Sequence, residues 1–417
     1  MKRTPRLFAI AAIGSLTLTA CGGSGFEDSG GGEAGDSEAP ASAEGPAELT
    51  MLIASSGDAE TEAVEEAAAE WAEESGNQVE VRVAADMNQE LAQGFAGGNP
   101  PDIFYLDAAQ LAQQASTGNL YAYEATDNDD FYPSLRETFT WDDTQWCAPK
   151  DFSTLALQIN TAAWEEAGLT DEDIPTTYDE LSSVAEQLTE GDQVGLVLSP
   201  GIDRAGVFVV GNGGWWLNDE GTEPTGTSEE VLAGLQYLQD NMAEGHVAYA
   251  GSVDAGWGGE AFGTGRAAMT IEGNWIRGAM SNDYPDVDYT VVEVPEGPAG
   301  PGTLLFSQCW GVAAASDAQA QAVELINHLT DPEQQMEFAD AFGVMPSRQS
   351  VAGEYEEAYP EDAPFIAGGD YGHGPVNAPG MTPVVEDLNS QLEGITNADL
   401  QQVMESFDTN ASSALDQ

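Results

Sequence analysis

The sequence predicts an α/β protein of two lobes, in which each lobe is a mostly parallel sheet flanked by helices. The chain has 417 residues, 41% of them hydrophobic, which is too long for one ordinary core and apolar enough for two. Strand and helix patterns alternate along the first part of the globular region. Residues 146–160 then read as a passage between two units, since Trp, Cys and Pro lead through a charged pair into an alternating strand pattern.

The N-terminus has the pattern of an export signal. Residues 1–6 are rich in basic side chains, and residues 7–18 form an apolar run that is shorter than the roughly 20 residues of a transmembrane helix. Leu18-Thr19-Ala20-Cys21 resembles a bacterial lipobox, which predicts a signal peptide over 1–20 and a lipid on Cys21. An ordinary signal peptide with an incidental cysteine is the alternative. Residues 21–46 are then the lipidated Cys and a flexible tether rich in Gly and Ser.

The charge of the chain excludes several classes of partner. The formal net charge is -63, and Lys150 is the only Lys after residue 2. Phosphate contacts need clustered Lys and Arg, so we expect neither nucleic-acid binding nor attraction to anionic lipid head groups. The acidity itself indicates a solvating surface. We also expect no cofactor and no metal site, because residues 127–130 lack the Gly and the distal Glu of a calcium loop.

The globular region begins with three strand–helix units. Gly76-Asn77 and the Gly/Pro run 97–101 act as breaks between them. Ligands of such sheets bind beyond the carboxyl ends of the strands, where Ser56, Asp58 and Asp107 lie. The expected strands are 48–54, 79–83 and 102–106, and the expected helices are 58–75, 88–96 and 107–117.

A second set of elements follows residues 146–160. The segments 211–221 and 256–265 are rich in glycine and read as irregular, although each contains Trp. The region after 348 reads as helical with one Gly/Pro-rich loop over 367–383. The expected strands are 194–198, 267–271, 287–294 and 308–314, and the expected helices are 161–167, 177–188, 228–244, 317–329 and 331–342. Residues 272–275 are expected to open a further helix.

Several stretches resemble the extracellular solute-binding proteins of ABC importers, family 1, the carbohydrate-binding group related to maltose-binding protein. The most specific is 262–275, which is similar to that family's F-x-x-G-x-x-A-M-x-x-x-G-x-W segment. Residues 150–160 resemble the first crossing between lobes, but Ile159-Asn160-Thr161 stands where the family often has Tyr-Asn-Lys. The other matching stretches are 95–104, 311–341 and 343–348.

The resemblance implies a two-lobe periplasmic-binding-protein-like fold joined by three hinge crossings. Lobe one would be 47–151 plus 312–344, and lobe two 155–308 plus 348–417. It further implies a monomer, not an enzyme, that captures a mono- or oligosaccharide by hinge closure. The protein would deliver this sugar to the transmembrane subunits of an ABC permease, from the outer face of the cell membrane.

A sugar presents flat apolar faces and a rim of hydroxyls, so its site needs aromatic rings together with carboxylates, amides or Arg. Trp275 is the first candidate ring, because it is the Trp of the most specific motif. Core packing is the alternative for every Trp candidate, Trp275 included. The chain has many carboxylates, and Asp107 and Asp151 are chosen because they lie at a strand end and at a crossing. Lys150 is chosen because it is the only Lys of the globular region, and a structural ion pair at the hinge is its equal alternative. The further ring candidates are Trp215, Trp216, Trp257 and Trp310, and the polar candidates are Asp107, Asp151, Arg348, Lys150, Ser56, Asp58 and Asn274.

Other interpretations stay open at this point. Cys147 and Cys309 form either one disulfide or two buried thiols. The same fold could bind a polyamine, a peptide or an osmolyte, since net acidity favours the approach of a cationic ligand. A secreted glycosidase with paired carboxylates is the enzymatic alternative. A serine hydrolase is disfavoured, because the sequence has no G-x-S-x-G motif.

Overall fold

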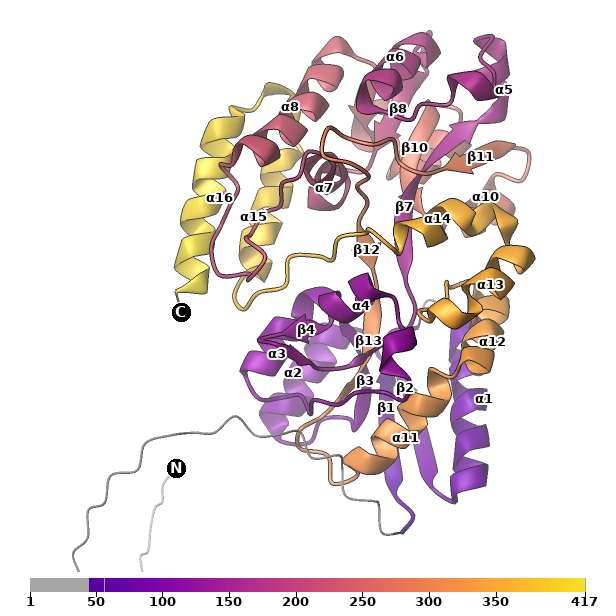
Figure 1. The fold of residues 1–417 in the computed structure, drawn as a ribbon, viewed down its shortest axis with the longest axis vertical. Helices are drawn as coiled ribbons and strands as arrows, with labels where there is room; N and C mark the ends of the chain where they lie inside the picture. Colours follow the sequence, from indigo (N-terminus) through magenta and orange to yellow (C-terminus); the bar gives the residue numbers. More distant parts are fainter. Residues whose placement is uncertain (1–44, 56, 417) are drawn as a thin grey trace, which may run out of the picture. The chain divides into compact units, whose positions relative to one another are not determined.

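The computed structural model describes residues 45–55 and 57–416, and two large sheets organise them (Figure 1). The predicted signal peptide, Cys21 and Ser56 lie outside the described residues. In the first sheet, with strand order β2-β1-β3-β13-β6, the interior strand β1 (Glu48–Ile53) lies between two parallel neighbours. The other strands are β2 (Gln78–Val83), β3 (Ile103–Asp107), β13 (Gln308–Val312) and β6 (Ala148–Pro149).

The second sheet has the order β11-β7-β10-β8-β9, and β12 pairs with β7 beyond the end of this path. The long strand β7 (Ser153–Asn160) runs antiparallel to β10 and β11, whereas β8 is parallel to β10 and β9. The remaining bounds are β11 (Tyr289–Val292), β10 (Ala267–Gly273), β8 (Val194–Leu198), β9 (Val247–Tyr249) and β12 (Leu305–Phe306). A small hairpin pairs β4 (Thr140–Trp141) with β5 (Thr144–Gln145).

Both sheets are mixed, so the prediction of mostly parallel sheets is wrong in this respect. In the first sheet, β13 enters antiparallel to β3 and β6, because the chain comes back from the second sheet. In the second sheet, β7 runs against both of its long neighbours. The α/β class itself is confirmed, since helices cover the sheets (Figure 1).

The first sheet is covered by helices from both ends of its sequence. Helix α1 (Asp58–Ser75) packs against α11 (Gln319–Leu329) and α12 (Pro332–Phe342). It ends at Gly76, whose φ of 77° is the left-handed conformation that glycine adopts without strain. Fully buried Phe104, Leu325 and Ile326 belong to the core of this lobe. Its other helices are α2 (Met87–Gly97), α3 (Leu111–Ser116) and α4 (Pro133–Thr138).

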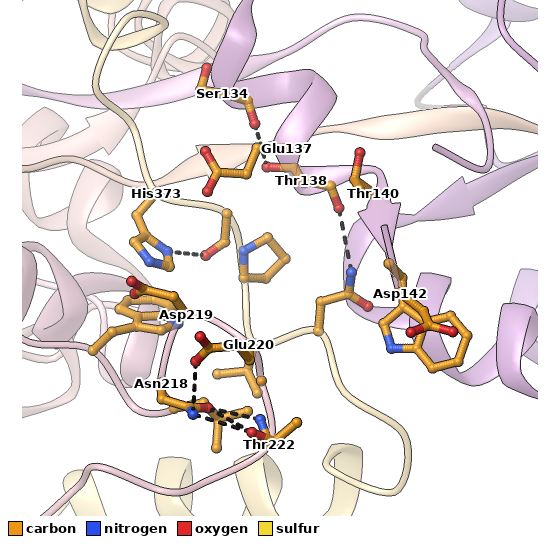
Figure 2. Close-up of a pocket in the computed structure, with 18 of the residues that line it drawn as sticks. Ser134, Glu137, Thr138, Thr140, Asp142, Asn218, Asp219, Glu220, Thr222 and His373 are labelled. Atoms are coloured by element: carbon orange, nitrogen blue, oxygen red, sulfur yellow. Dashed lines mark hydrogen bonds between the residues drawn. The ribbon is translucent and has the colours of Figure 1, made fainter. Parts of the chain in front are cut away.

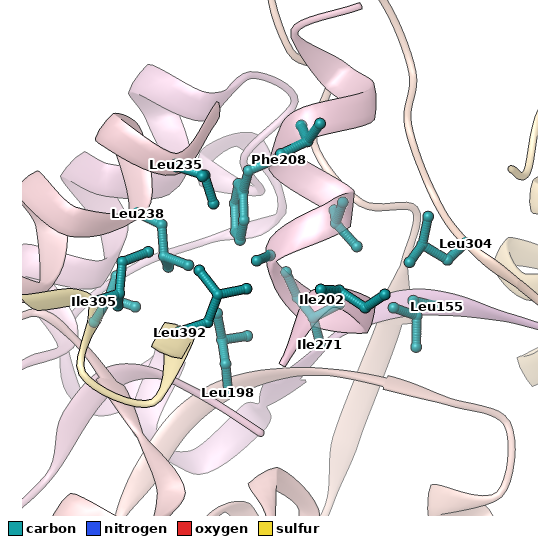
Figure 3. Packing of buried hydrophobic residues seen from close by; sticks show 14 of the residues in the cluster. Leu155, Leu198, Ile202, Phe208, Leu235, Leu238, Ile271, Leu304, Leu392 and Ile395 are labelled. Atoms are coloured by element: carbon teal, nitrogen blue, oxygen red, sulfur yellow. The ribbon is translucent and has the colours of Figure 1, made fainter. Parts of the chain in front are cut away.

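The second sheet has a larger apolar core (Figure 3). Ile271 of β10 and Leu198 of β8 pack with Phe208 of α7 and with helices of the C-terminal region. The bounds are α5 (Thr161–Glu166), α6 (Tyr178–Leu188), α7 (Ile202–Gly211), α8 (Glu229–Glu244), α9 (Gly258–Gly263), α10 (Ile276–Asp283), α13 (Ala352–Ala358), α14 (Ala363–Gly368), α15 (Thr382–Leu392) and α16 (Leu400–Leu415). Short 3₁₀ turns lie at Ala108–Gln110, Asn128–Asp130, Asp171–Asp173, Ala250–Val253, Gln349–Val351, Pro360–Asp362 and Ile395–Asn397.

Helices α4, α7 and α9 are absent from the sequence prediction. The segment of α7 contains a β-branched run at its end, and α9 lies in a stretch that glycine makes a poor helix former. Helix α7 is stabilised by packing and not by its intrinsic helix propensity, because most of its residues are buried in the core of the second lobe.

Three chain crossings between the sheets run side by side and hydrogen-bond to one another. The amide of Lys150 donates to the carbonyl of Gln308 over 2.8 Å, and that of Phe152 donates to Met345 over 3.1 Å. The hydroxyl of Ser347 donates to the carbonyl of Pro149 over 2.9 Å. The segments 149–152, 306–308 and 343–348 therefore form one joint between the sheets.

Cys147 and Cys309 form a disulfide that ties two crossing segments together on the first-sheet side of the joint, with Cα atoms 5.7 Å apart. Both residues are fully buried, and 162 positions separate them in sequence. A crosslink that closes so long a loop removes much conformational entropy from the unfolded chain.

We predict that the double substitution Cys147→Ala/Cys309→Ala lowers the free energy of unfolding by about 2–5 kcal/mol. Urea unfolding followed by circular dichroism measures the change. Single substitutions, which also break the crosslink, should cost about as much. An unfolding free energy within about 0.5 kcal/mol of the wild type, an effect typical of a neutral surface change, would show that the disulfide contributes little.

Candidate functional site

A buried ion cluster lies at the joint between the sheets. The ammonium group of Lys150, which is 6% exposed, lies 3.1 Å from Glu60 Oε1 and also bonds the Asp151 carboxylate. It lies 4.6 Å from the ring centre of Tyr105, whose hydroxyl donates to Glu60 over 3.0 Å. Lys150 and Asp151 are both predicted site residues, and the structure brings them into direct contact.

Burial governs the protonation of this cluster. Burial alone would lower the pKa of Lys150, but the charges of Asp151 and Glu60 outweigh it and raise that pKa. Burial raises the pKa of the Asp151 carboxyl, and the neighbouring ammonium only partly offsets the rise. The pKa of Tyr105 rises well above its ordinary value, first through burial and then through the two carboxylates.

Two further carboxyls, one at the end of a first-sheet strand and one on a second-lobe helix, lie within electrostatic reach. Asp107 ends β3 and accepts a hydrogen bond from the Ala109 amide over 2.9 Å, while Asp203 lies in the first turn of α7. Burial raises the pKa of both, and the charge of Asp203 adds to the rise at Asp107. Both side chains are nonetheless exposed to solvent. The surrounding protein therefore reduces their hydration but does not remove it.

Trp275 is a large apolar side chain that stays 40% exposed. Its indole N–H donates to Glu272 Oε2 over 3.2 Å, and its ring meets Phe306 edge-on with centroids 5.2 Å apart. The ring lies directly against Gly273, where an added Cβ would come within 2.2 Å of a ring carbon. Only glycine leaves room for the indole in this position.

Arg204 and Glu272 support the Trp275 ring from within the second lobe. Glu272 is fully buried and pairs with Arg204, and it accepts a hydrogen bond from the Ser199 hydroxyl over 3.0 Å. The guanidinium carbon of Arg204 lies 5.7 Å from the centre of the Trp275 ring. We call Ser199, Arg204, Glu272, Trp275 and Phe306 the Trp275 cluster.

Two of the predicted rings are core residues instead. Trp216 and Trp310 are fully buried; Trp216 packs in the core of the second lobe, and Trp310 meets Tyr105 edge-on at 4.9 Å. Their burial corrects the expectation that they face a ligand, because no face of either ring is open. Trp257 is half-buried, and its ring covers Gly259 at the start of α9.

Arg348 and Asn274 are structural in their contacts. Arg348 is 2% exposed, and its guanidinium donates to the carbonyls of Thr126, Asp127 and Thr330. Burial lowers its pKa. The Asn274 side chain donates to the carbonyl of Gly343 over 3.2 Å, so it links β10 to the third crossing. Asp58 is exposed in the first turn of α1, where a carboxylate favours the helix N-terminus.

A separate cavity of about 660 Å³ lies between α4, the β4–β5 hairpin and two segments of the second lobe (Figure 2). Of the predicted residues it contains Trp215, whose ring lies 3.9 Å from that of His373, centre to centre. Burial lowers the pKa of His373. Many polar groups here already bond to one another or to nearby backbone: Asn218 bonds Glu220 and Thr222, and Asn377 bonds the Ala112 amide.

The Trp275 cluster and the ion cluster are the stronger candidate site, because an open ring face lies near the joint between the sheets. Sequence reasoning missed Arg204, Asp203, Glu272 and Glu60. Glu272 sits inside the recognised motif, so the motif could have pointed to it.

Within the described residues, no group of three or more His, Cys, Asp or Glu could hold a metal ion. None of the helices in 45–416, Ser56 aside, is both long and apolar enough to reach across a bilayer.

Comparisons with known proteins agree with this architecture. A family model described as bacterial extracellular solute-binding protein matches residues 66–365. A cyclic α-maltosyl-1,6-maltose binding protein from Arthrobacter globiformis superposes with a TM-score of 0.80 at 23% identity, covering 89% of this chain and 99% of that one. A solute-binding protein from Thermotoga lettingae bound to α-D-tagatose has a TM-score of 0.74 at 20% identity, and the match covers 88% of this chain and 99% of that one. A substrate-binding protein from Listeria monocytogenes in complex with cycloalternan has a TM-score of 0.76 at 20% identity, and the match covers 89% of this chain and 100% of that one. At these identities the likeness shows the fold.

We predict that Lys150→Met destabilises the protein by about 3–5 kcal/mol at pH 7, because two buried carboxylates lose their counter-charge. Ionised Asp151, whose pKa burial already raises, then costs folding free energy, and this cost disappears as the pH falls through that pKa. The deficit measured by urea unfolding should therefore shrink between pH 7 and pH 4. Arg82→Met, which breaks an exposed ion pair with Glu90, is the control and should cost under about 1 kcal/mol. A deficit for Lys150→Met that is small or constant with pH would contradict this account.

Proposed function

The chain belongs to the family of bacterial extracellular solute-binding proteins, and from this premise we propose that it captures a mono- or oligosaccharide for an ABC importer. The protein closes its two lobes on the sugar and delivers it to the transmembrane subunits of the permease. It acts as a carrier and not as an enzyme. The exposed face of Trp275 beside a charged joint between two lobes is the observation that carries this proposal.

The chemistry of the joint suits a sugar. The apolar face of a pyranose ring packs on an indole, and ring hydroxyls donate to carboxylates. Trp275 supplies the indole, and Asp107 and Asp203 supply acceptors on the two sides of the joint. The ligands of these structural neighbours are saccharides, from tagatose to cyclic oligosaccharides, which supports this ligand class.

Closure requires that the crossings bend while the lobes stay rigid. Each crossing is only a few residues long, whereas each sheet has its own apolar core. Hinges of this kind absorb a large change in backbone angles within a few positions. Asp107 on the first sheet and Asp203 on α7 then approach a ligand from opposite sides.

One observation favours a second ligand class. Asp107 and Asp203 bear like charges within electrostatic reach of each other, and a cation between them would relieve their repulsion. A polyamine, a basic peptide or a cationic osmolyte is therefore the alternative ligand for the same site. A glycosidase is the least favoured alternative, and release of a chromogen from a chromogenic glycoside by the purified protein would support it.

We further propose that the protein is exported as a lipoprotein and works as a monomer. Its lipobox-like sequence ends at Cys21, and residues 22–46 are rich in Gly and Ser. A lipid on Cys21 holds the binding domain at the outer face of the cell membrane through this tether. Labelling with a lipid precursor in a bacterial host, compared with Cys21→Ala, tests the lipid anchor.

We predict that a neutral sugar among D-tagatose, maltose and cycloalternan raises the melting temperature, because binding to the folded state stabilises it by mass action. Trp275→Ala should abolish this shift while leaving the melting temperature of the free protein nearly unchanged, since the ring is already partly hydrated. The matched control is Trp216→Ala, which should cost about 3–5 kcal/mol of stability because that ring is fully buried.

Two outcomes would contradict the proposal. A panel in which spermidine or a basic peptide shifts the melting temperature and no sugar does would replace the sugar with a cationic ligand. A large loss of stability in Trp275→Ala, without any effect on a sugar-induced shift, would make Trp275 a core residue.

A further inference from the structure

Arg204 is a buried cation with few partners for its hydrogens. Its side chain is 11% exposed, and among the described residues its guanidinium makes one hydrogen bond, from Nη2 to Glu272. Its Nε is buried without an acceptor. A guanidinium has five N–H donors, and buried donors without acceptors cost free energy. The structure thus leaves most of this group's donor capacity unused.

The surroundings of Arg204 place this unused capacity beside the Trp275 ring. The guanidinium carbon lies 5.7 Å from the centre of the Trp275 ring and 5.8 Å from that of Phe306. Within the described residues Nη1 has no hydrogen-bond partner, and the side chain as a whole keeps 11% of its surface exposed. A molecule that packs against the exposed part of the Trp275 ring therefore lies beside a guanidinium with unused N–H donors.

Glu272 determines the charge that such a molecule encounters. Its carboxylate is fully buried and pairs with Arg204, so the two charges cancel. Lys150 is opposed by two carboxylates, and Asp107 and Asp203 add further negative charge on the two sides of the joint. The site as a whole is negative, and Arg204 offers donor hydrogens without a free positive charge.

We propose that Arg204 is a ligand-binding residue that donates to oxygen atoms of a neutral sugar on Trp275, and that Glu272 is its positioning residue. The inference rests on the proposed function and names its substrate class more narrowly. The carboxylate of Glu272 accepts hydrogen bonds from both the Arg204 guanidinium and the Trp275 indole N–H. These two bonds fix the position of the guanidinium relative to the indole ring. Because Glu272 cancels the charge of Arg204, the site selects against sugars that carry a carboxylate.

The test measures dissociation constants by calorimetry for whichever of D-tagatose, maltose and cycloalternan binds the wild type most tightly. Arg204→Gln should weaken binding about tenfold or more, since hydrogen bonds from a charged donor contribute about 1.5–3 kcal/mol. Arg204→Lys should recover part of the loss, because Lys keeps charge and donors but lacks the planar fork. Arg82→Gln, on an exposed ion pair, is the matched control and should bind like the wild type.

The role of Glu272 has its own readout. The ratio of dissociation constants is compared for D-glucose and D-glucuronate, which differ by one carboxylate, in the wild type and in Glu272→Gln. The wild type should prefer the neutral sugar, and Glu272→Gln should shrink this preference at least several-fold, because the positive charge of Arg204 is then uncancelled. A general loss of structure would weaken both sugars alike and leave the ratio unchanged.

The outcomes separate this inference from the proposed function. If the wild type binds none of the sugars, the proposed function fails and the inference falls with it. If the wild type binds a sugar and Arg204→Gln binds it equally well, the role of Arg204 is overturned and the proposed function stands. If Glu272→Gln leaves the preference for the neutral sugar unchanged, Glu272 is not the positioning residue.

Discussion

The ammonium group of Lys150 lies at the joint where three crossings of the chain run side by side, and its charge must be balanced without water. Glu60 from α1 and Asp151 from the first crossing supply this balance. Gln335 of α12 donates to the carbonyl of Lys150 over 3.1 Å and to the hydroxyl of Ser347 over 2.7 Å. Because a buried charge tolerates little displacement of its partners, this cluster keeps the crossings in register.

The positions of the candidate site residues depend on how the three crossings are aligned. Asp107 at the carboxyl end of β3 and Asp203 in the first turn of α7 lie within electrostatic reach of each other. Strand β10 ends beside the start of β7, so Trp275 lies near the joint and not on the far side of the second lobe. The ion cluster and the exposed indole thus lie together at the joint, where the proposed sugar would contact both lobes.

Much of the fold could be predicted from residue patterns, and most of the site could not. Strand β8 and helix α1 have the bounds that periodicity and a glycine stop indicate. Helix α7 was not predicted, because its β-branched residues favour a strand and only burial makes the segment helical. Arg204, which lies in this helix, was therefore not recognised as a site residue. Trp215 and Trp216 are neighbours, and sequence alone does not say which one is buried. Glu60 is one acid among many in α1, and only the tertiary structure places it beside Lys150.

The central claim is that a sugar binds on Trp275 at the joint between the lobes. A crystal structure of the protein grown with the tightest-binding sugar tests it most directly. The account predicts electron density for a sugar ring on the indole of Trp275, with a ring oxygen or hydroxyl within hydrogen-bonding distance of Arg204 Nη1 and the lobes closed on it. Density for the sugar in the separate cavity beside Trp215 and His373, with the face of Trp275 left open to solvent, would contradict it.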